Sequence, residues 1–243
     1  QRLLPFSYTG LYFIIKDEPN IPIKEKNLLS GIYGQQTKYT DFFYSGTVSF
    51  IAVIFQPLGI KLLLDMPLDD FTDKVISLND LNDKDFRELE EQLQEELDCK
   101  KRVSLLEKYL LERISFYDEE KVDYRRVYAA INLMRLGENN IREIARHTCL
   151  SYKQFKRVFS GYTGINPKDY SRIIRFQRAS YFLQTNIGIS LEQLSGKSGY
   201  YDKSHLIKDF RKYSGYTPEK YLSLCDDYSG YHSLFRSAFL DLP

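Results

Sequence analysis

Two short stretches of the sequence concentrate side chains that can bind a polyanion. The first contains Ser151, Tyr152, Lys153, Gln154, Lys156 and Arg157, and the second contains Tyr201, Asp202, Lys203, Ser204, His205, Lys208 and Arg211. Lysine and arginine neutralise phosphates, both can pair with guanine, and glutamine can pair with adenine. We therefore predict that these two sets contact double-stranded DNA. For any single member the alternative is an ordinary solvated side chain, and Gln154 could serve only as a helix cap.

The sequence offers no comparable set for catalysis. It contains no Gly-rich phosphate loop, no His-x-x-x-His metal pair and no Gly-x-Ser-x-Gly nucleophile motif. The histidines, at positions 147, 205 and 232, lie far apart, and the three cysteines are too few and too scattered for a disulfide framework or a zinc site. We expect no enzyme activity, no metal and no cofactor.

Each stretch opens a predicted helix. Ser151 and Gln154 have the spacing of a capping box, and Asp202 can cap the second helix. Two apolar residues four positions apart define the inward face of each helix: Phe155 and Phe159 in the first, Leu206 and Phe210 in the second.

A shorter helix is predicted before each of these two helices. Capping-box spacings, Asn140 with Glu143 and Ser190 with Gln193, mark where the shorter helices begin. A short helix, a tight connection and a second helix with basic side chains form the outline of a helix-turn-helix motif. The sequence therefore contains this outline twice.

A long helix is predicted between the two motifs. Each motif closes with a similar segment, 164–170 and 215–221, in which Gly ends one helix, Asn or Thr caps the next, and Pro takes its first position. The first of these segments opens a helix over 167–184, whose apolar residues spread around much of its circumference. Such a helix packs against two neighbours, so we expect it to fix the separation of the motifs.

The charge divides the chain in two. Residues 1–120 contain 14 basic and 22 acidic side chains, whereas residues 121–224 contain 19 basic and 8 acidic ones. An acidic half joined to a basic half favours two domains, the second of which faces a polyanion, although a solvated basic surface would give the same count. We place the boundaries at 1–118 and 123–224, followed by a tail over 225–243.

With these residues in view, 124–224 resemble the DNA-binding domain of the AraC/XylS family of transcription regulators. The resemblance rests on Ile144-Ala145, Ser151, Phe155, Arg157-Val158-Phe159, Gly164, Pro167, Tyr170, Arg175, Ala179, Leu183, Gly199-Tyr200, Ser204, Phe210, Lys212, Gly215, Thr217-Pro218 and Tyr221. It implies two helix-turn-helix subdomains joined by a long helix, with both recognition helices in successive major grooves.

The chain departs from the family pattern at several positions. Leu194-Ser195 replaces the usual Ile-Ala, Leu206 stands where Phe is common, and Leu222 stands where Arg is common. Asp209 adds a negative charge to the second recognition helix, unless it faces inward or pairs with Lys212 or Arg211.

The N-terminal part reads as a β-rich domain with two amphipathic helices, which makes the whole chain α+β. Runs over 11–15, 28–33, 37–44 and 47–55 are rich in β-branched and aromatic residues, and we expect the last run to be central in a sheet. A short helix is predicted over 58–64, an irregular segment over 66–81, and amphipathic helices within about 83–115, one of them with a stripe of Phe86, Leu89, Leu93 and Leu97. These helices could cover the sheet, join two subunits, or do both.

The N-terminal part resembles, more weakly, the β-rich sensor domains of the same family. Its aromatic residues could line a pocket for a small apolar or sugar-like effector, or simply form a core; the candidates are Tyr12, Tyr33, Phe43, Tyr44 and Phe55. We expect a cytoplasmic regulator without a membrane span, with DNA as partner, a small-molecule effector and RNA polymerase as further partners, and a homodimer as its assembly. The alternative is a protein-interaction or anti-activator module that uses the helical domain without DNA.

Overall fold

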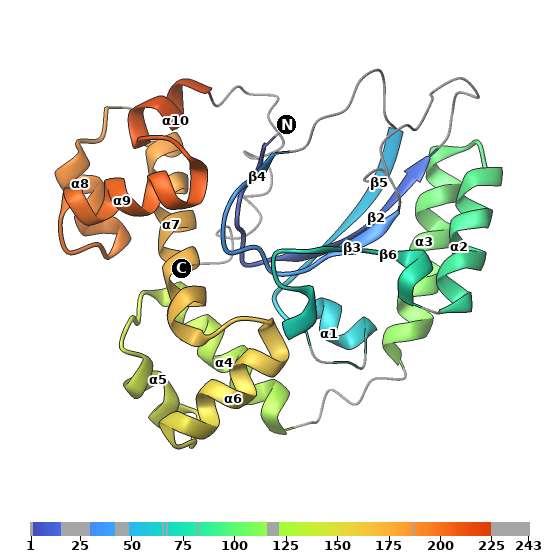
Figure 1. Cartoon of the computed structure of the whole chain (residues 1–243), viewed down its shortest axis with the longest axis horizontal. Coiled ribbons are helices and arrows are strands. Elements are labelled where there is room, and N and C mark those ends of the chain that lie inside the picture. Colours follow the sequence, from blue (N-terminus) through green and yellow to red (C-terminus); the bar gives the residue numbers. More distant parts are fainter. Residues whose placement is uncertain are drawn as a thin grey trace.

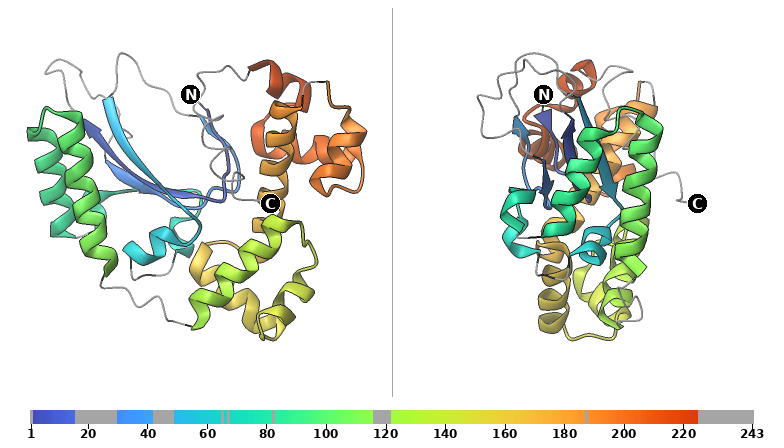
Figure 2. Two further views of the ribbon diagram at one scale, coloured as in Figure 1. Left: turned by 180° about the vertical axis from the view of Figure 1, so that it is seen from behind. Right: turned by 90° about the vertical axis from the view of Figure 1, so that its right-hand side faces the viewer.

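The computed structural model describes residues 2–15, 30–41, 49–64, 66, 68–81, 83–115, 122–186 and 188–224. An antiparallel sheet lies in the middle of the molecule, with a pair of helices on one side and the helical C-terminal part on the other (Figures 1 and 2). The α+β class predicted from the sequence is confirmed. The left view of Figure 2 shows from behind that the C-terminal helices form a separate layer beside the sheet.

The sheet has the strand order β5-β2-β3-β6, and every pairing in it is antiparallel. Its strands are β2 (Thr9–Ile15), β3 (Gly31–Tyr33), β5 (Ser49–Phe55) and β6 (Val75–Ser77), while β1 (Arg2–Leu3) pairs separately with β4 (Thr40–Asp41). The prediction that β5 is central is wrong, because β5 is an edge strand of the described sheet. The face of β5 that points away from the core carries apolar side chains that are exposed, among them Phe50 at 58% and Ile54 at 40%. Because the strand is apolar on both faces, its sequence is typical of a buried central strand.

One face of this sheet carries the first hydrophobic core. The side chains of Leu11, Phe13 and Ile32 point to this face and are fully buried. They meet Phe86 and Leu93 of the helix α2 (Lys84–Glu95), which is capped by Asp83. The helices α1 (Gly59–Leu63) and α3 (Cys99–Ser115) complete this layer, so the amphipathic helices cover the sheet of their own chain.

Two details of this layer differ from the sequence prediction. The segment 66–81, expected to be irregular, contains β6 and the 3-10 helices η1 (Asp69–Phe71) and η2 (Leu78–Leu81). The stripe of α2 stops at Leu93: the helix ends at Glu95, and Leu97 is 85% exposed. Neither difference changes which face of the sheet the helices cover.

The C-terminal part contains two groups of helices along a long central one (Figure 1). The helices are α4 (Val122–Leu136), α5 (Ile141–His147), α6 (Tyr152–Thr163), α7 (Pro167–Thr185), α8 (Leu191–Ser198), α9 (Lys203–Ser214) and α10 (Pro218–Leu224). Asn166 caps α7 and Pro167 takes its first position, as predicted. Ten residues of α7 are buried, and the helix contacts α4, α6, α8, α9 and α10, which confirms that it separates the two motifs.

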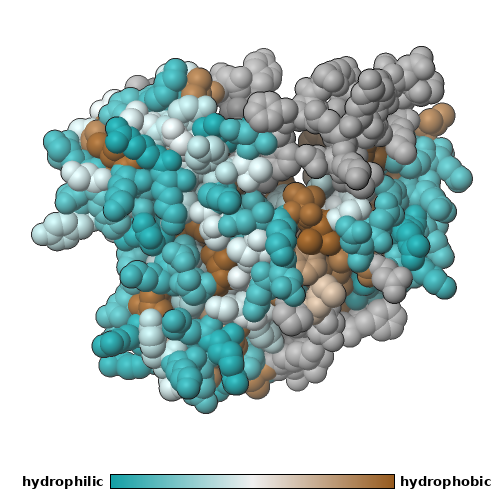
Figure 3. Space-filling view, in the orientation of Figure 1, coloured by the Kyte–Doolittle hydropathy of each residue, from teal (hydrophilic) through white to brown (hydrophobic). Residues whose placement is uncertain are grey.

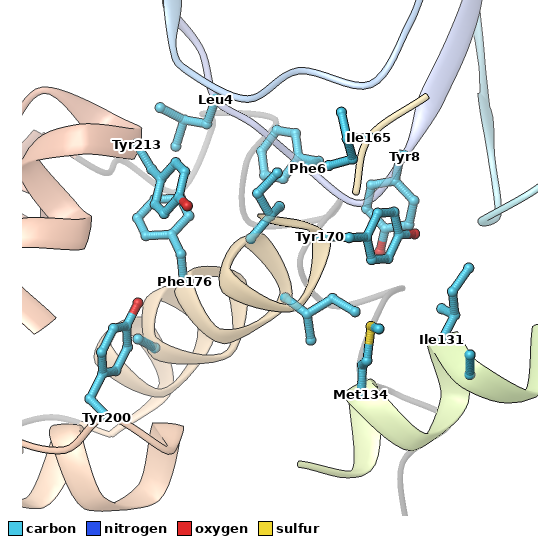
Figure 4. Close-up of a cluster of buried hydrophobic side chains, with 14 of the residues drawn as sticks. Leu4, Phe6, Tyr8, Ile131, Met134, Ile165, Tyr170, Phe176, Tyr200 and Tyr213 are labelled. Atoms are coloured by element: carbon cyan, nitrogen blue, oxygen red, sulfur yellow. The ribbon is translucent and has the colours of Figure 1, made fainter. Parts of the chain in front are cut away.

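The N-terminal segment 2–8 packs against these helices rather than only against its own sheet. Leu4, Phe6 and Tyr8 belong to the same buried cluster as Tyr170 and Phe176 of α7. Figure 4 shows the three N-terminal side chains lying over α7, with Tyr8 beside Tyr170. The division into 1–118 and 123–224 remains our proposal for the domain boundaries, but the hydrophobic packing crosses it.

Candidate nucleic-acid interface

The first motif consists of α5 and α6. The side chain of Ser151 accepts a hydrogen bond from the backbone N–H of Gln154, and the Gln154 side chain reaches back to the cap, so the predicted capping box is present. Asn140 caps α5, but Glu143 pairs instead with Arg146 at 2.7 Å. Capping at both helix starts fixes the direction in which α6 leaves the turn.

The predicted DNA-contacting residues of α6 all face solvent. Phe155 and Phe159 are fully buried against the rest of the domain, which turns the opposite side of the helix outward. The exposed set is Ser151, Tyr152, Lys153, Gln154, Lys156 and Arg157. The Lys156 ammonium group lies 5.9 Å from the centre of the Tyr152 ring, a cation–π contact that keeps the two side chains together on the surface.

The second motif, α8 and α9, repeats this local architecture. Ser190 and Gln193 form a complete capping box, and Gly199 ends α8 in the left-handed region. Asp202 caps α9 by accepting a hydrogen bond of 2.8 Å from the backbone N–H of His205. Leu206, which stands where the AraC/XylS family commonly has Phe, is fully buried, so this position still packs inward.

The outward side of α9 also carries the predicted residues. Tyr201, just before the helix, is 94% exposed, whereas His205 is partly buried. Asp202, Lys203, Ser204, Lys208 and Arg211 are exposed. Figure 3 shows a mainly hydrophilic surface over both groups of helices. The two motifs thus present polar, mostly basic side chains from corresponding places.

Glu192 is a member of this surface that the sequence analysis missed. Its carboxylate accepts a hydrogen bond of 3.0 Å from the Lys203 ammonium group, and both side chains are more than half exposed. The hydrogen bond from Lys203 lowers the pKa of Glu192. Glu192 lies in the first turn of α8, where acidic residues are common because they stabilise the helix N-terminus. The sequence alone therefore provides no reason to assign it to the surface around Lys203.

Asp209 faces inward, and its partners differ from those considered from the sequence. Its carboxylate is fully buried and lies 2.7 Å from the guanidinium group of Arg172 and 3.8 Å from that of Arg175, both on α7. Pairing with Lys212 or Arg211 is not what the structure contains. Arg172 and Arg175 stand far from Asp209 in sequence, so spacing could not reveal these pairs.

The residues proposed for an effector pocket do not converge. Tyr12 and Tyr33 lie on one face of the sheet, with ring centres 6.5 Å apart, and Phe55 lies on the other face within the core. Phe43 and Tyr44 lie outside the described residues. A small cavity between the sheet and the helices has a volume of about 10 Å³ and is lined by Ser7, Thr9, Thr163 and Tyr170 among others, which is room for one water molecule.

The described part of the chain contains no group of three or more His, Cys, Asp or Glu side chains placed to hold a metal ion. None of the helices described is both long enough and apolar enough to cross a bilayer.

Two capped helix pairs on one connecting helix define the class of this region: it is a double helix-turn-helix domain. Residues 144–223 match a family described as a helix-turn-helix domain, and residues 1–77 match a domain of unknown function (DUF6597). The match over 144–223 covers α6 to α9, together with the inward residues of both motifs.

Two curated proteins align with about a third of the chain. The Msm operon regulatory protein of Streptococcus mutans is 28% identical over 81 residues, 33% of this chain and 29% of its own length. The HTH-type transcriptional regulator ArgR of Pseudomonas aeruginosa is 31% identical over 78 residues, 32% of this chain and 23% of its own length. The alignments thus span less than a third of either relative.

Two solved structures are similar to the chain. An AraC-type transcriptional regulator from Chromobacterium violaceum is 24% identical, with a TM-score of 0.38 over 41% of this chain and 90% of its own. An apo ToxT variant from Vibrio cholerae is 11% identical, with a TM-score of 0.46 over 93% of this chain and 94% of its own. The family match and the geometry of the two motifs agree: the C-terminal part is a double helix-turn-helix domain, whose motif residues resemble those of AraC-type regulators.

Proposed function

We propose that the protein is a transcription regulator that binds double-stranded DNA sequence-specifically through both helix-turn-helix motifs. The observation that carries the proposal is the division of α6 and α9 into a buried, mainly apolar face and an exposed face of basic and other polar side chains. A recognition helix needs this division, because its apolar face anchors it while its polar face enters the major groove.

The charge of the two motifs supports the same proposal. Residues 121–224 contain 19 basic and 8 acidic side chains, and phosphate contacts by such side chains release condensed counterions from DNA. In α6, Lys153, Lys156 and Arg157 are not accompanied by any acidic residue. In α9, Lys203 is paired with Glu192, and the helix also carries Asp209, which is buried on its inward face. We infer that the first motif supplies the larger share of the electrostatic attraction.

The connecting helix supports simultaneous binding by both motifs. The two motifs lie toward opposite ends of α7, on the side of the molecule remote from α2 and α3 (Figures 1 and 2). Because α7 is buried along most of its length, it holds the two recognition helices as a rigid connection. We propose that they enter successive major grooves of one duplex.

The remaining partners are part of the proposal as well. We propose a small-molecule effector acting on the N-terminal part, RNA polymerase as a protein partner, a homodimer, and a cytoplasmic location for the protein. The packing of residues 2–8 against α7 gives an effector a physical route to the DNA-binding part. The competing function is a protein-interaction or anti-activator module, in which the same helices bind a protein and not DNA.

The test is in vitro selection of random duplexes with the full chain, followed by fluorescence anisotropy titrations of the enriched sequence at several salt concentrations. We expect a defined sequence motif and an affinity that falls steeply as salt rises, with a slope of roughly −0.9 per phosphate contacted. Failure to enrich any sequence, together with equal weak binding to all duplexes, would favour the protein-interaction alternative.

A further inference from the structure

The interior of the second motif contains a cluster of ion pairs formed by Asp209, Arg172 and Arg175. Exposed side chains can contact DNA without such a cluster. Asp209, on the inward face of α9, is fully buried. Its oxygen Oδ1 accepts a hydrogen bond of 2.7 Å from the Arg172 guanidinium group. Burying a carboxylate costs several kcal/mol unless it is paired, and an apolar residue at an inward position is often at least as stabilising. A cluster of this kind therefore suggests a role beyond stability.

The second carboxylate oxygen of Asp209 has two donors within reach and a hydrogen bond from neither. Oδ2 is buried and lies 3.8 Å from a guanidinium nitrogen of Arg175 and 3.8 Å from Nε2 of His205. The Nε atom of Arg175 is also buried without a hydrogen-bond partner. A small rotation of either side chain would bring its N–H within hydrogen-bonding distance, so Oδ2 is an acceptor that both Arg175 and His205 can reach.

His205 connects this buried cluster to the surface that we propose faces DNA. Its backbone N–H is held by Asp202, and its side chain stands one turn before Asp209 on the same helix face. The imidazole ring makes an edge contact with Tyr200 at 5.1 Å, and 36% of the side chain remains exposed. One ring nitrogen is thus directed toward Asp209, and part of the ring remains open to solvent.

The charged and titratable groups around this histidine come from three places. α7 contributes Arg172 and Arg175, α9 contributes Asp209, and the connection between α8 and α9 contributes Tyr200 and Asp202. Burial raises the pKa of Tyr200 well above its ordinary value, so this phenol stays neutral near pH 7. The Arg175 guanidinium group also lies over the Tyr200 ring at 4.7 Å, a cation–π contact that holds it whether or not it donates to Oδ2.

We propose that Asp209 is a positioning residue for DNA recognition by the second motif: it stabilises His205 as an imidazolium that contacts DNA. The inference rests on the proposed function. When His205 takes up one proton from water, its Nε2–H can donate to Oδ2 of Asp209. The ring then carries a positive charge between this buried carboxylate and the phosphates or base acceptors of DNA. Binding is therefore linked to the uptake of one proton.

The sign of the pH dependence follows from this linkage. Histidine side chains exchange their proton near pH 6.5, and a complex that binds one more proton than the free protein becomes tighter as the pH falls. The affinity should rise by at most about tenfold per pH unit, the limit for a single linked proton. The second motif would thus contribute little to the DNA-binding affinity at pH 8 and more at pH 6.

The experiment compares full-length wild type, His205→Gln and Asp209→Asn by anisotropy on the enriched duplex from pH 6.0 to pH 8.0 at constant ionic strength. The matched control is His147→Gln, which changes an exposed histidine of α5 in the first motif. We expect the wild type and the control to bind more tightly as the pH falls, His205→Gln to lose this dependence, and Asp209→Asn to reduce it.

Proton NMR of the wild type provides a readout that does not depend on how the variants fold. The titration midpoint of the His205 ring should move upward when DNA is added. A pH profile unchanged in His205→Gln, or a midpoint that DNA leaves in place, overturns the inference while DNA binding stands. Absence of binding by the wild type at every pH overturns both the inference and the proposed function.

Discussion

The hydroxyl group of Ser7 donates a hydrogen bond of 2.8 Å to the side-chain oxygen of Gln177, although 170 positions separate the two residues. Both are buried, and the backbone oxygen of Ser7 also accepts a hydrogen bond of 3.2 Å from Tyr170. This segment therefore connects the β-rich part to the helix that carries both motifs.

Replacement of Ser7 by alanine should destabilise the fold. The side-chain oxygen of Gln177 would remain buried without its donor, which costs about 1–3 kcal/mol. Urea unfolding at pH 7 measures this loss. The control is Ser204→Ala, an exposed serine on α9, which should stay within about 0.5 kcal/mol of the wild type. Equal stabilities of the two variants would mean that the bond contributes nothing.

Replacement of Lys153 or Arg157 by alanine should weaken binding to the enriched DNA sequence. Each variant should lose about 1–3 kcal/mol of binding free energy and relax the preference at one position if its side chain contacts a base. A phosphate contact would instead weaken all sequences alike and flatten the salt dependence. Gel-shift titrations distinguish the two, with Lys100→Ala on α3 as the control. Unchanged affinity and preference in both variants would remove these residues from the interface.

Replacement of Glu192 by glutamine should tighten DNA binding. The change removes a negative charge next to Lys203 and leaves that ammonium group available to a phosphate. The gain should be similar on specific and non-specific duplexes, and the salt slope should steepen by roughly 0.9, the value for one additional phosphate contact. Anisotropy titrations check this, and Glu88→Gln on α2 removes the same charge from a site outside the interface. Weaker binding by the Glu192 variant would show that its carboxylate orients Lys203 productively.

The Arg2–Asp41 pair should make stability depend on pH in the acid range. The hydrogen bond from Arg2, 2.6 Å long, lowers the pKa of Asp41. A carboxyl group with a lowered folded-state pKa contributes stability above its ordinary range near pH 4, and this contribution is lost as the pH falls through the folded value. Asp41→Asn should therefore differ from the wild type at pH 7 and converge with it at low pH.

Urea midpoints from pH 7 to pH 3 measure this convergence. Asp70→Asn, which removes the same charge from an exposed position of η1, provides the control. A gap between the wild type and Asp41→Asn that is the same at every pH would contradict the assignment of this pair.

Two glycines at the end of α6 should respond oppositely to alanine. Gly164 has a φ of 81°, and a Cβ there would lie 2.8 Å from the backbone oxygen of Leu68, so Gly164→Ala should cost at least about 1–2 kcal/mol. Gly161 lies within the helix with open space around it, so Gly161→Ala should stabilise the fold by roughly 0.5–1 kcal/mol. Thermal unfolding compares the two, and a loss in both would indicate that α6 tolerates no added side chain.

The double motif could be predicted from the sequence because its determinants are local. Capping residues, the glycines that end helices, and apolar pairs four positions apart act within one or two turns. Ser151, Ser190 and Asp202 therefore marked helix starts that the structure confirms. The exposure of the recognition residues followed from the burial of their neighbours on the same helix.

The features that were missed depend on pairings between distant segments. The edge position of β5 and the existence of β6, only three residues long, are decided by which strands pair and not by composition. The ion pair of Asp209 with Arg172 forms across 37 positions, and the packing of residues 2–8 on α7 across more than 160. No periodicity within a single element contains this information.

The burial of α7 on nearly all sides has an evolutionary consequence. A residue inserted into a helix turns everything beyond it by about 100° and advances it by about 1.5 Å. One insertion in α7 would rotate α9 relative to α6 and disrupt the packing of α7 against the helices of both motifs. Under the function that we propose, single exchanges of surface side chains could therefore change the bases that are read, while the distance between the two half-targets would stay fixed.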